Sequence, residues 1–72
     1  MDLLAESGGH RVIAIEVKAI AAPTRTDARH LLWLQETLGD RLVAGAVLHT
    51  GPAAYELAEG IVALPICALW ST

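Results

Sequence analysis

The chain has few of the residues that mark specialised small proteins. Its 72 residues include one cysteine, Cys67, and no phenylalanine, and only 18% of them are charged. One cysteine excludes an internal disulfide and suits a reducing compartment, which predicts a cytoplasmic location. Because a lone cysteine in an apolar run is more typical of core filling than of a nucleophile, we expect Cys67 to be buried.

Basic residues are scarce as well. Lys and Arg total 5 against 8 Asp and Glu, giving a formal net charge of -3. A chain with this net negative charge does not favour binding of a polyanion, so nucleic-acid binding by the chain alone is expected to be weak. No basic region followed by an apolar one opens the chain, so no signal peptide is predicted. The longest apolar run, residues 61–70, is interrupted by Pro65 and is too short for a membrane span.

The length and the hydrophobic content do not match a self-sufficient domain. Residues 1–72 allow one domain, and a domain this small buries only about 60% of its unfolded surface. Yet 54% of the residues are hydrophobic. Either apolar surface meets a partner or the chain is part of something larger, and we predict self-association or a protein partner.

Residues 11–19, RVIAIEVKA, form an apolar run that predicts a central strand. Side chains two apart share a face of a strand. One face is fully apolar and is predicted to belong to the core: Ile13, Ile15 and Val17. The other face carries Val12, Ala14, Glu16 and Lys18. Taken alone, a Glu-x-Lys on a strand is more typical of a solvated ion pair worth under roughly 1 kcal/mol.

Residues 2–7 predict a first strand, joined to the central one by a turn at Gly8 and Gly9. Leu3 and Ala5 should share the apolar face of Ile15, and only an odd loop, residues 8–10, allows this. A slip of one residue would exchange the faces. The odd loop sets Asp2 directly opposite Glu16, about 5 Å apart at Cβ. Two facing carboxylates are destabilising unless a cation lies between them.

One helix is predicted over residues 24–38. Thr24 and Asp27 fit a capping box at its start, with Thr26 as the rival cap, and Gly39 fits its C-terminal cap. Residues 41–49 read as a third strand, apolar on both faces, as in a strand covered on both sides. A strand-helix-strand unit predicts that it runs parallel to the second strand through a right-handed connection.

The end of the chain is less regular. Residues 53–60 are compatible with a helical turn or an irregular loop, and residues 61–64 with a short strand ended by Pro65. Residues 66–70 predict a last helical turn that packs Leu69 and Trp70 against the body. The predicted fold class is α/β (α+β), a small mixed sheet with an N-terminal hairpin, a crossover and a short C-terminal strand. One helix can cover only one sheet face.

Several stretches together resemble a known family. The Asp2 strand, the Gly-Gly hairpin and Glu16-Val17-Lys18 resemble the Asp…Glu-x-Lys signature of the PD-(D/E)XK nuclease fold. More narrowly, the chain resembles the C-terminal domain of a bacterial and archaeal family of AAA-type ATPases of unknown function. The matching stretches are residues 2–4 (DLL), 13–19 (IAIEVKA), 38–41 (LGDR), 43–48 (VAGAVL), 50–51 (TG), 63–65 (ALP) and 68–70 (ALW).

The resemblance implies a metal-dependent chemistry. It makes Asp2, Glu16 and Lys18 the catalytic residues of a nuclease that hydrolyses phosphodiesters. Asp2, Glu16 and the carbonyl of Val17 would bind Mg²⁺ or Mn²⁺, which prefer oxygen ligands. Lys18 would orient a water or neutralise charge.

The departures from the family are also informative. No Gly-rich loop followed by Lys-Ser or Lys-Thr is present, so no nucleotide binding is predicted. The helix and strand that open the nuclease-like fold are missing before Asp2, which predicts an incomplete restriction-endonuclease-like fold and a fragment of a longer protein. We therefore expect a nuclease-like domain that is inactive alone. The alternatives are a Mg²⁺-dependent nuclease acting on DNA and a protein–protein interaction module.

The three histidines do not predict a metal site. His10, His30 and His49 have no zinc-site spacing and are expected to be solvated or capping residues.

Overall fold

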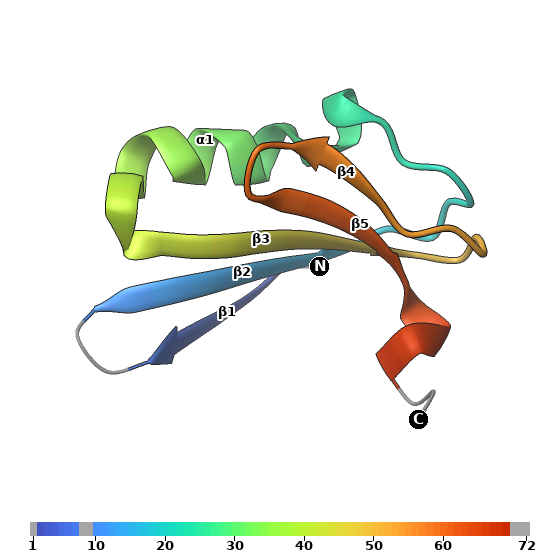
Figure 1. Cartoon of the computed structure of the whole chain (residues 1–72), viewed down its shortest axis with the longest axis horizontal. Helices are drawn as coiled ribbons and strands as arrows, with labels where there is room; N and C mark the ends of the chain where they lie inside the picture. The colour runs from blue at the N-terminus through green and yellow to red at the C-terminus, as the bar shows by residue number, and fades with distance from the viewer. Residues whose placement is uncertain (1, 8–9, 70–72) are drawn as a thin grey trace.

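The chain folds into one mixed sheet with a helix on one side (Figure 1). The computed structural model describes the backbone of residues 2–7 and 10–69 and the side chains of residues 10–67. Five strands lie in the order β1-β2-β3-β5-β4. Their bounds are Asp2–Ser7 for β1, Arg11–Val17 for β2, Leu42–His49 for β3, Tyr55–Ala58 for β4 and Ile61–Pro65 for β5. The predicted mixed α/β class is confirmed.

The N-terminal hairpin has the predicted register. Strands β1 and β2 are antiparallel, and their pairs run from Asp2 opposite Glu16 to Ser7 opposite Arg11. The connection is therefore residues 8–10, the odd loop that the apolar pattern required. His10 has a φ of 66°, the left-handed conformation that often ends a three-residue hairpin loop.

The crossover from β2 to β3 contains the predicted helix in two parts. A 3-10 turn, η1 (Arg25–Ala28), leads directly into α1 (Arg29–Leu38). The Asp27 carboxylate accepts hydrogen bonds from the Thr24 amide at 2.8 Å and from its hydroxyl at 3.2 Å, which fixes the start. Gly39 has a φ of 56°, and its amide donates to the Gln35 carbonyl at the C-terminal end. A second 3-10 turn, η2 (Gly39–Arg41), enters β3, which is parallel to β2.

The C-terminal part contains a strand that the sequence pattern did not identify. Strand β5 is parallel to β3, and β4 is antiparallel to β5 at the edge of the sheet. The prediction of a helical turn or an irregular loop over residues 53–60 is wrong for Tyr55–Ala58. Tertiary contacts decide this segment: the Tyr55 hydroxyl donates to the Pro23 carbonyl at 2.6 Å, and Leu57 packs against the core.

The chain after β5 forms a 3-10 turn, η3 (Ile66–Leu69), in agreement with the predicted last turn. The predicted packing of Leu69 and Trp70 lies outside the described residues. The expectation that Cys67 is buried is wrong, because its side chain is exposed.

The prediction that the face of Ile13, Ile15 and Val17 belongs to the core is wrong, because α1 covers the opposite face of β2. Val12, Ala14 and Glu16 are buried, and Ala14 belongs to the core with Leu31 of α1. Gly45, which pairs with Ala14, lies on this covered face. A Cβ added at Gly45 would meet Ile61 Cγ1 of β5 at 3.3 Å and would be in ordinary contact with Leu31 Cδ1 at 3.5 Å.

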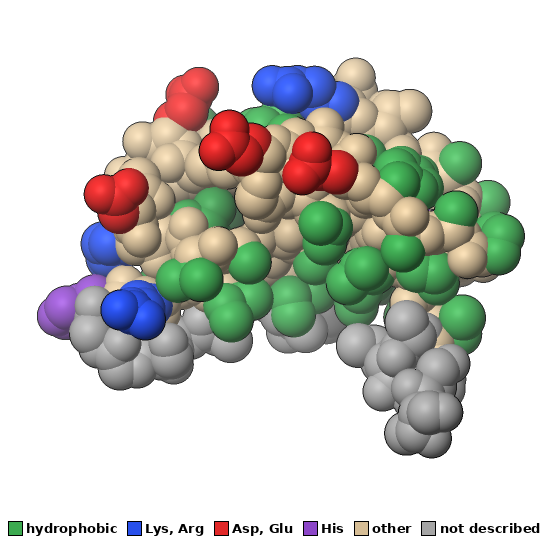
Figure 2. Space-filling model, in the orientation of Figure 1, with side chains coloured by type: hydrophobic (Ala, Val, Ile, Leu, Met, Phe, Trp, Pro, Cys, Tyr) green, Lys and Arg blue, Asp and Glu red, His purple; other side chains and the backbone are tan. Residues whose placement is uncertain are grey.

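The fully apolar face of the sheet is open in the described part of the chain. Ile13 on β2 is 40% exposed, and Val43 at the bulge of β3 is 55% exposed. Figure 1 places α1 on the upper side of the sheet, with no α-helix on the lower side. Hydrophobic side chains gather along that lower side in Figure 2. The single α-helix therefore covers one face of the sheet, as expected from a sequence that predicts one helix.

Candidate functional site

The most unusual side chain of the described region is Glu16. It lies next to the last residue of β2, between Asp2 of β1 and Val47 of β3 in the sheet register. Only 4% of its side chain is exposed. Acidic side chains are almost never this buried unless they are paired or bind a metal.

Two nitrogen groups, an ammonium and an imidazole, approach the same oxygen of Glu16. Lys18 Nζ lies 3.4 Å from Oε2, and His30 Nδ1 lies 3.8 Å from it. Both distances exceed the 2.7–3.2 Å of a good hydrogen bond. The other oxygen, Oε1, is buried and has no hydrogen-bond partner among the described side chains and backbone. Nearly all buried polar atoms in native proteins have a partner, so this unpaired oxygen points to a ligand.

Lys18 stands at the rim of the site. Its side chain is 38% exposed, on the same face as Glu16. Its amide donates to the Leu48 carbonyl of β3 at 2.9 Å. Because a trans peptide points its N–H and C=O in opposite directions, the Val17 carbonyl is directed toward the β1 side of β2, where Asp2 lies.

The backbones of the four predicted site residues thus lie close together at one end of β1 and β2. Glu16 and Lys18 come together, the Val17 carbonyl points to the same side of β2 as β1, and Asp2 faces Glu16 in the backbone register. The Asp2 side chain lies outside the described side chains. Within residues 10–67, no group of three or more His, Cys, Asp or Glu side chains could hold a metal ion. The donors fit a divalent cation only if Asp2 completes the set.

The site lies where ligands commonly bind in sheets of this kind. Glu16, Lys18 and His49 cluster toward the carboxyl ends of the parallel strands β2 and β3. In open α/β sheets the crevice outside these ends is the usual ligand position. Glu16 is therefore buried at the end of the sheet that is best suited to bind a ligand.

The histidines were underestimated by sequence reasoning. His49 is buried rather than solvated. Its Nδ1 accepts a hydrogen bond from the Gly51 amide at 3.0 Å, and its Nε2 has no partner among the described residues. His30 is exposed but approaches Glu16. The only available signal for His30 was its position in the first turn of a crossover helix, which can pack over the end of the preceding strand.

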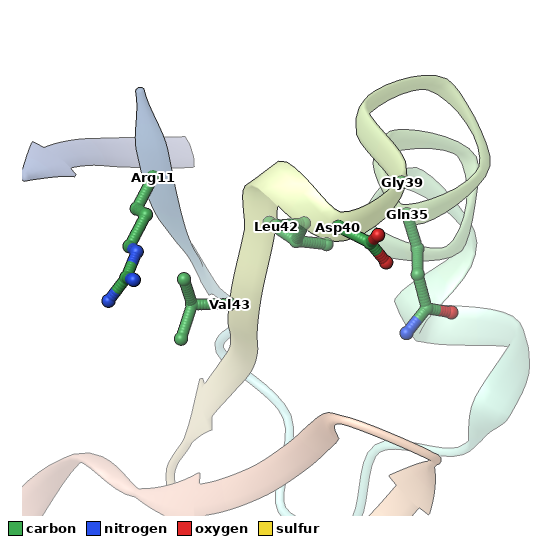
Figure 3. Close-up of a pocket in the computed structure, with 6 residues that line it drawn as sticks. All are labelled: Arg11, Gln35, Gly39, Asp40, Leu42 and Val43. Carbon is green, nitrogen blue, oxygen red and sulfur yellow. The ribbon is translucent and has the colours of Figure 1, made fainter. Parts of the chain in front are cut away.

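An open depression lies at the opposite end of the sheet (Figure 3). Its lining residues are Arg11, Gln35, Gly39, Asp40, Leu42 and Val43. Figure 3 shows Arg11 on the β2 side and Gln35 and Asp40 on the helix side, with Leu42 and Val43 between them. Arg11 and Asp40 are the two charged residues that line this depression, and their side chains lie on opposite sides of it. The lining residues therefore include no charged groups that converge on one point, as a catalytic site would need.

Comparison with protein families identifies the class of this domain. Residues 1–69 match the model of a domain of unknown function, DUF4143. The chain belongs to that family. Neither a curated protein nor a solved structure matches it. No helix in the described ranges has the length and apolar character that a membrane span requires.

Proposed function

We propose that the chain is a PD-(D/E)XK nuclease-like domain, related to the C-terminal domains of AAA-type ATPases, with little or no nuclease activity on its own. One observation carries this proposal: the buried Glu16 carboxylate has an unpaired oxygen, faces Asp2 across the hairpin and lies 3.4 Å from Lys18 Nζ. This is the residue combination that the Asp…Glu-x-Lys resemblance implies.

Each residue has a defined role in this proposal. Asp2, Glu16 and the Val17 carbonyl would hold Mg²⁺ or Mn²⁺, for which oxygen donors are suited. Such an ion, when bound, would acidify a water and neutralise charge on a phosphodiester. Lys18, with its ammonium at the rim, orients that water or offsets the charge of the phosphate.

Weak activity is expected from the charge balance. The net charge of -3 opposes accumulation of a polyanion, and phosphate neutralisation by Lys and Arg supplies most non-specific DNA affinity. The domain is proposed to act in the cytoplasm, bound to a protein partner or to another copy of itself. No nucleotide is part of the proposal.

The direct test is cleavage of supercoiled plasmid in Mg²⁺ and in Mn²⁺. We expect the wild-type chain to cleave no faster than Lys18→Ala, which removes the ammonium from a partly exposed position. Metal-dependent cleavage that Lys18→Ala abolishes would instead establish a working nuclease acting on DNA.

A second candidate function, an interaction module, is favoured by the open sheet face. Ile13 and Val43 are 40% and 55% exposed on that face, and an exposed apolar patch on a small protein marks an interaction surface. Strand β1 is also an edge, and its sequence has no Pro or Lys to discourage pairing.

We assign this surface to a second copy of the chain. A two-fold contact would pair the β1 edges and bring the two open faces together, which suits an apolar surface that is complementary to itself. Sedimentation velocity at micromolar concentration should show a dimer. A soluble monomer that does not bind a hydrophobic dye would exclude this function.

A further inference from the structure

His30 belongs to the helix but lies against the strand carboxylate. It is the second residue of α1, and its side chain is 65% exposed. Its Nδ1 lies 3.8 Å from Glu16 Oε2. This contact joins the start of the crossover helix to the end of β2, so an exposed imidazole reaches a buried carboxylate.

The distance distinguishes two kinds of contact. At 3.8 Å the nitrogen and oxygen are too far apart for a hydrogen bond. Two donors that each lie about 2.0–2.2 Å from one metal ion are separated by roughly 3–4 Å. The spacing of Nδ1 and Oε2 is therefore compatible with joint ligation of one ion.

The second observation is the free coordination capacity of Glu16. Oε1 is buried and has no hydrogen-bond partner within the part of the chain that the structure describes. The third group nearby, Lys18 Nζ, is 3.4 Å from Oε2 on a side chain that is 38% exposed. The ammonium can therefore move into solvent when a cation binds, which leaves both carboxylate oxygens available.

We propose that His30 is a metal-binding residue of the Glu16 site and that it makes the site select a divalent first-row transition ion over Mg²⁺. This inference rests on the metal site of the proposed function and adds a nitrogen donor to it. Imidazole is a good ligand for transition ions, whereas Mg²⁺ demands oxygen donors. Mn²⁺, which accepts both, is the suitable probe.

The experiment measures Mn²⁺ binding by electron paramagnetic resonance, and Mg²⁺ affinity by competition. His30→Ala should weaken Mn²⁺ binding by about tenfold or more, since even second-shell partners of metal ligands contribute 10–100-fold. Mg²⁺ affinity should change less than about threefold, because Mg²⁺ gains little from imidazole. His10→Asn is the matched control: it removes an exposed histidine on the hairpin loop and keeps a residue that tolerates the positive φ.

A spectroscopic readout separates ligation from a structural effect. Bound Mn²⁺ should show electron-spin-echo modulation from an imidazole nitrogen, which disappears in His30→Ala and persists in His10→Asn. Circular dichroism of His30→Ala should equal that of the wild type, as expected for an exposed helical position.

The outcomes distinguish this inference from the function on which it rests. If Glu16→Gln abolishes Mn²⁺ binding but His30→Ala leaves affinity and modulation unchanged, His30 is not a ligand and the Glu16 site stands. Equal weakening of Mn²⁺ and Mg²⁺ by His30→Ala, without a nitrogen signal, also overturns the assignment. If Glu16→Gln binds Mn²⁺ as the wild type does, both the site and the role of His30 are refuted.

Discussion

Glu16 and Lys18 share the helix-covered face of β2, with Nζ 3.4 Å from Oε2, yet the carboxylate is buried and the ammonium is partly in water. Only one partner of this contact, Glu16, is therefore buried. Lys18 can leave it at little cost, whereas Glu16 remains enclosed between α1 and the sheet with one oxygen unpaired. In a purely structural ion pair, the hydrogen-bonding groups of both partners would be satisfied. The difference in burial therefore supports a ligand-binding role for Glu16.

The first prediction concerns the free-energy cost of burying the Glu16 carboxylate in the folded state. Glu16→Met keeps the length of the side chain and removes an incompletely paired buried carboxylate, so it should raise the free energy of unfolding by about 1 kcal/mol. Urea denaturation measures this. The exposed Glu56→Met is the control and should change stability by less than about 0.5 kcal/mol. A loss of more than about 1 kcal/mol in Glu16→Met would show that the carboxylate stabilises the fold.

The second prediction concerns the junction after β3. A Cβ added at Gly51 would overlap the carbonyl oxygen of Ala21, in a segment where the Thr50 amide also donates to the Ile20 carbonyl. Gly51→Ala should therefore cost roughly 2–3 kcal/mol, as overpacking against backbone does. Gly60→Ala, where the added Cβ meets only the end of the Gln35 side chain at 3.4 Å, should cost only about 1–2 kcal/mol through its positive φ. Thermal denaturation compares the two; equal losses would contradict the close approach.

The third prediction concerns the open sheet face. Ile13→Lys places a charge in the centre of that face and should convert a dimer to a monomer in sedimentation velocity. Trp33→Lys is the comparison, because Trp33 is an exposed apolar residue on the outer side of α1. If the two substitutions have the same effect on the sedimentation coefficient, the open face is not the contact surface.

The hairpin register was predictable because only a loop with an odd number of residues places the apolar side chains of both strands on the same face. Leu3 and Ala5 had to pair with Ile15 and Ile13, and they do. The covered face of β2 was not predictable from the strand alone. It depended on the long-range packing of α1, whose Leu31 shares the core with Ala14, and alternation within β2 does not contain that contact.

The two largest errors have the same origin in long-range contacts. Strand β4 forms because residues 55–58 pair with β5, a partner whose position no local pattern gives. The closeness of His30 to Glu16 depends on the helix packing over the end of β2, 14 positions earlier in the sequence. Of the candidate site, alternation and loop parity predicted that Asp2, Glu16 and Lys18 share a face. The Val17 carbonyl was implied only by the family resemblance, and the helical contribution was not predicted.

The central claim is that Asp2 and Glu16 bind one divalent cation, and Mn²⁺-induced broadening of backbone amide NMR signals tests it most directly. We expect substoichiometric Mn²⁺ to broaden first the amides of Asp2, Glu16, Val17 and Lys18, which lie together at one end of β1 and β2. Asp2→Asn should remove this effect. Broadening that begins instead around the exposed acidic residues Asp40, Glu56 and Glu59, with no change at Glu16, would contradict the claim.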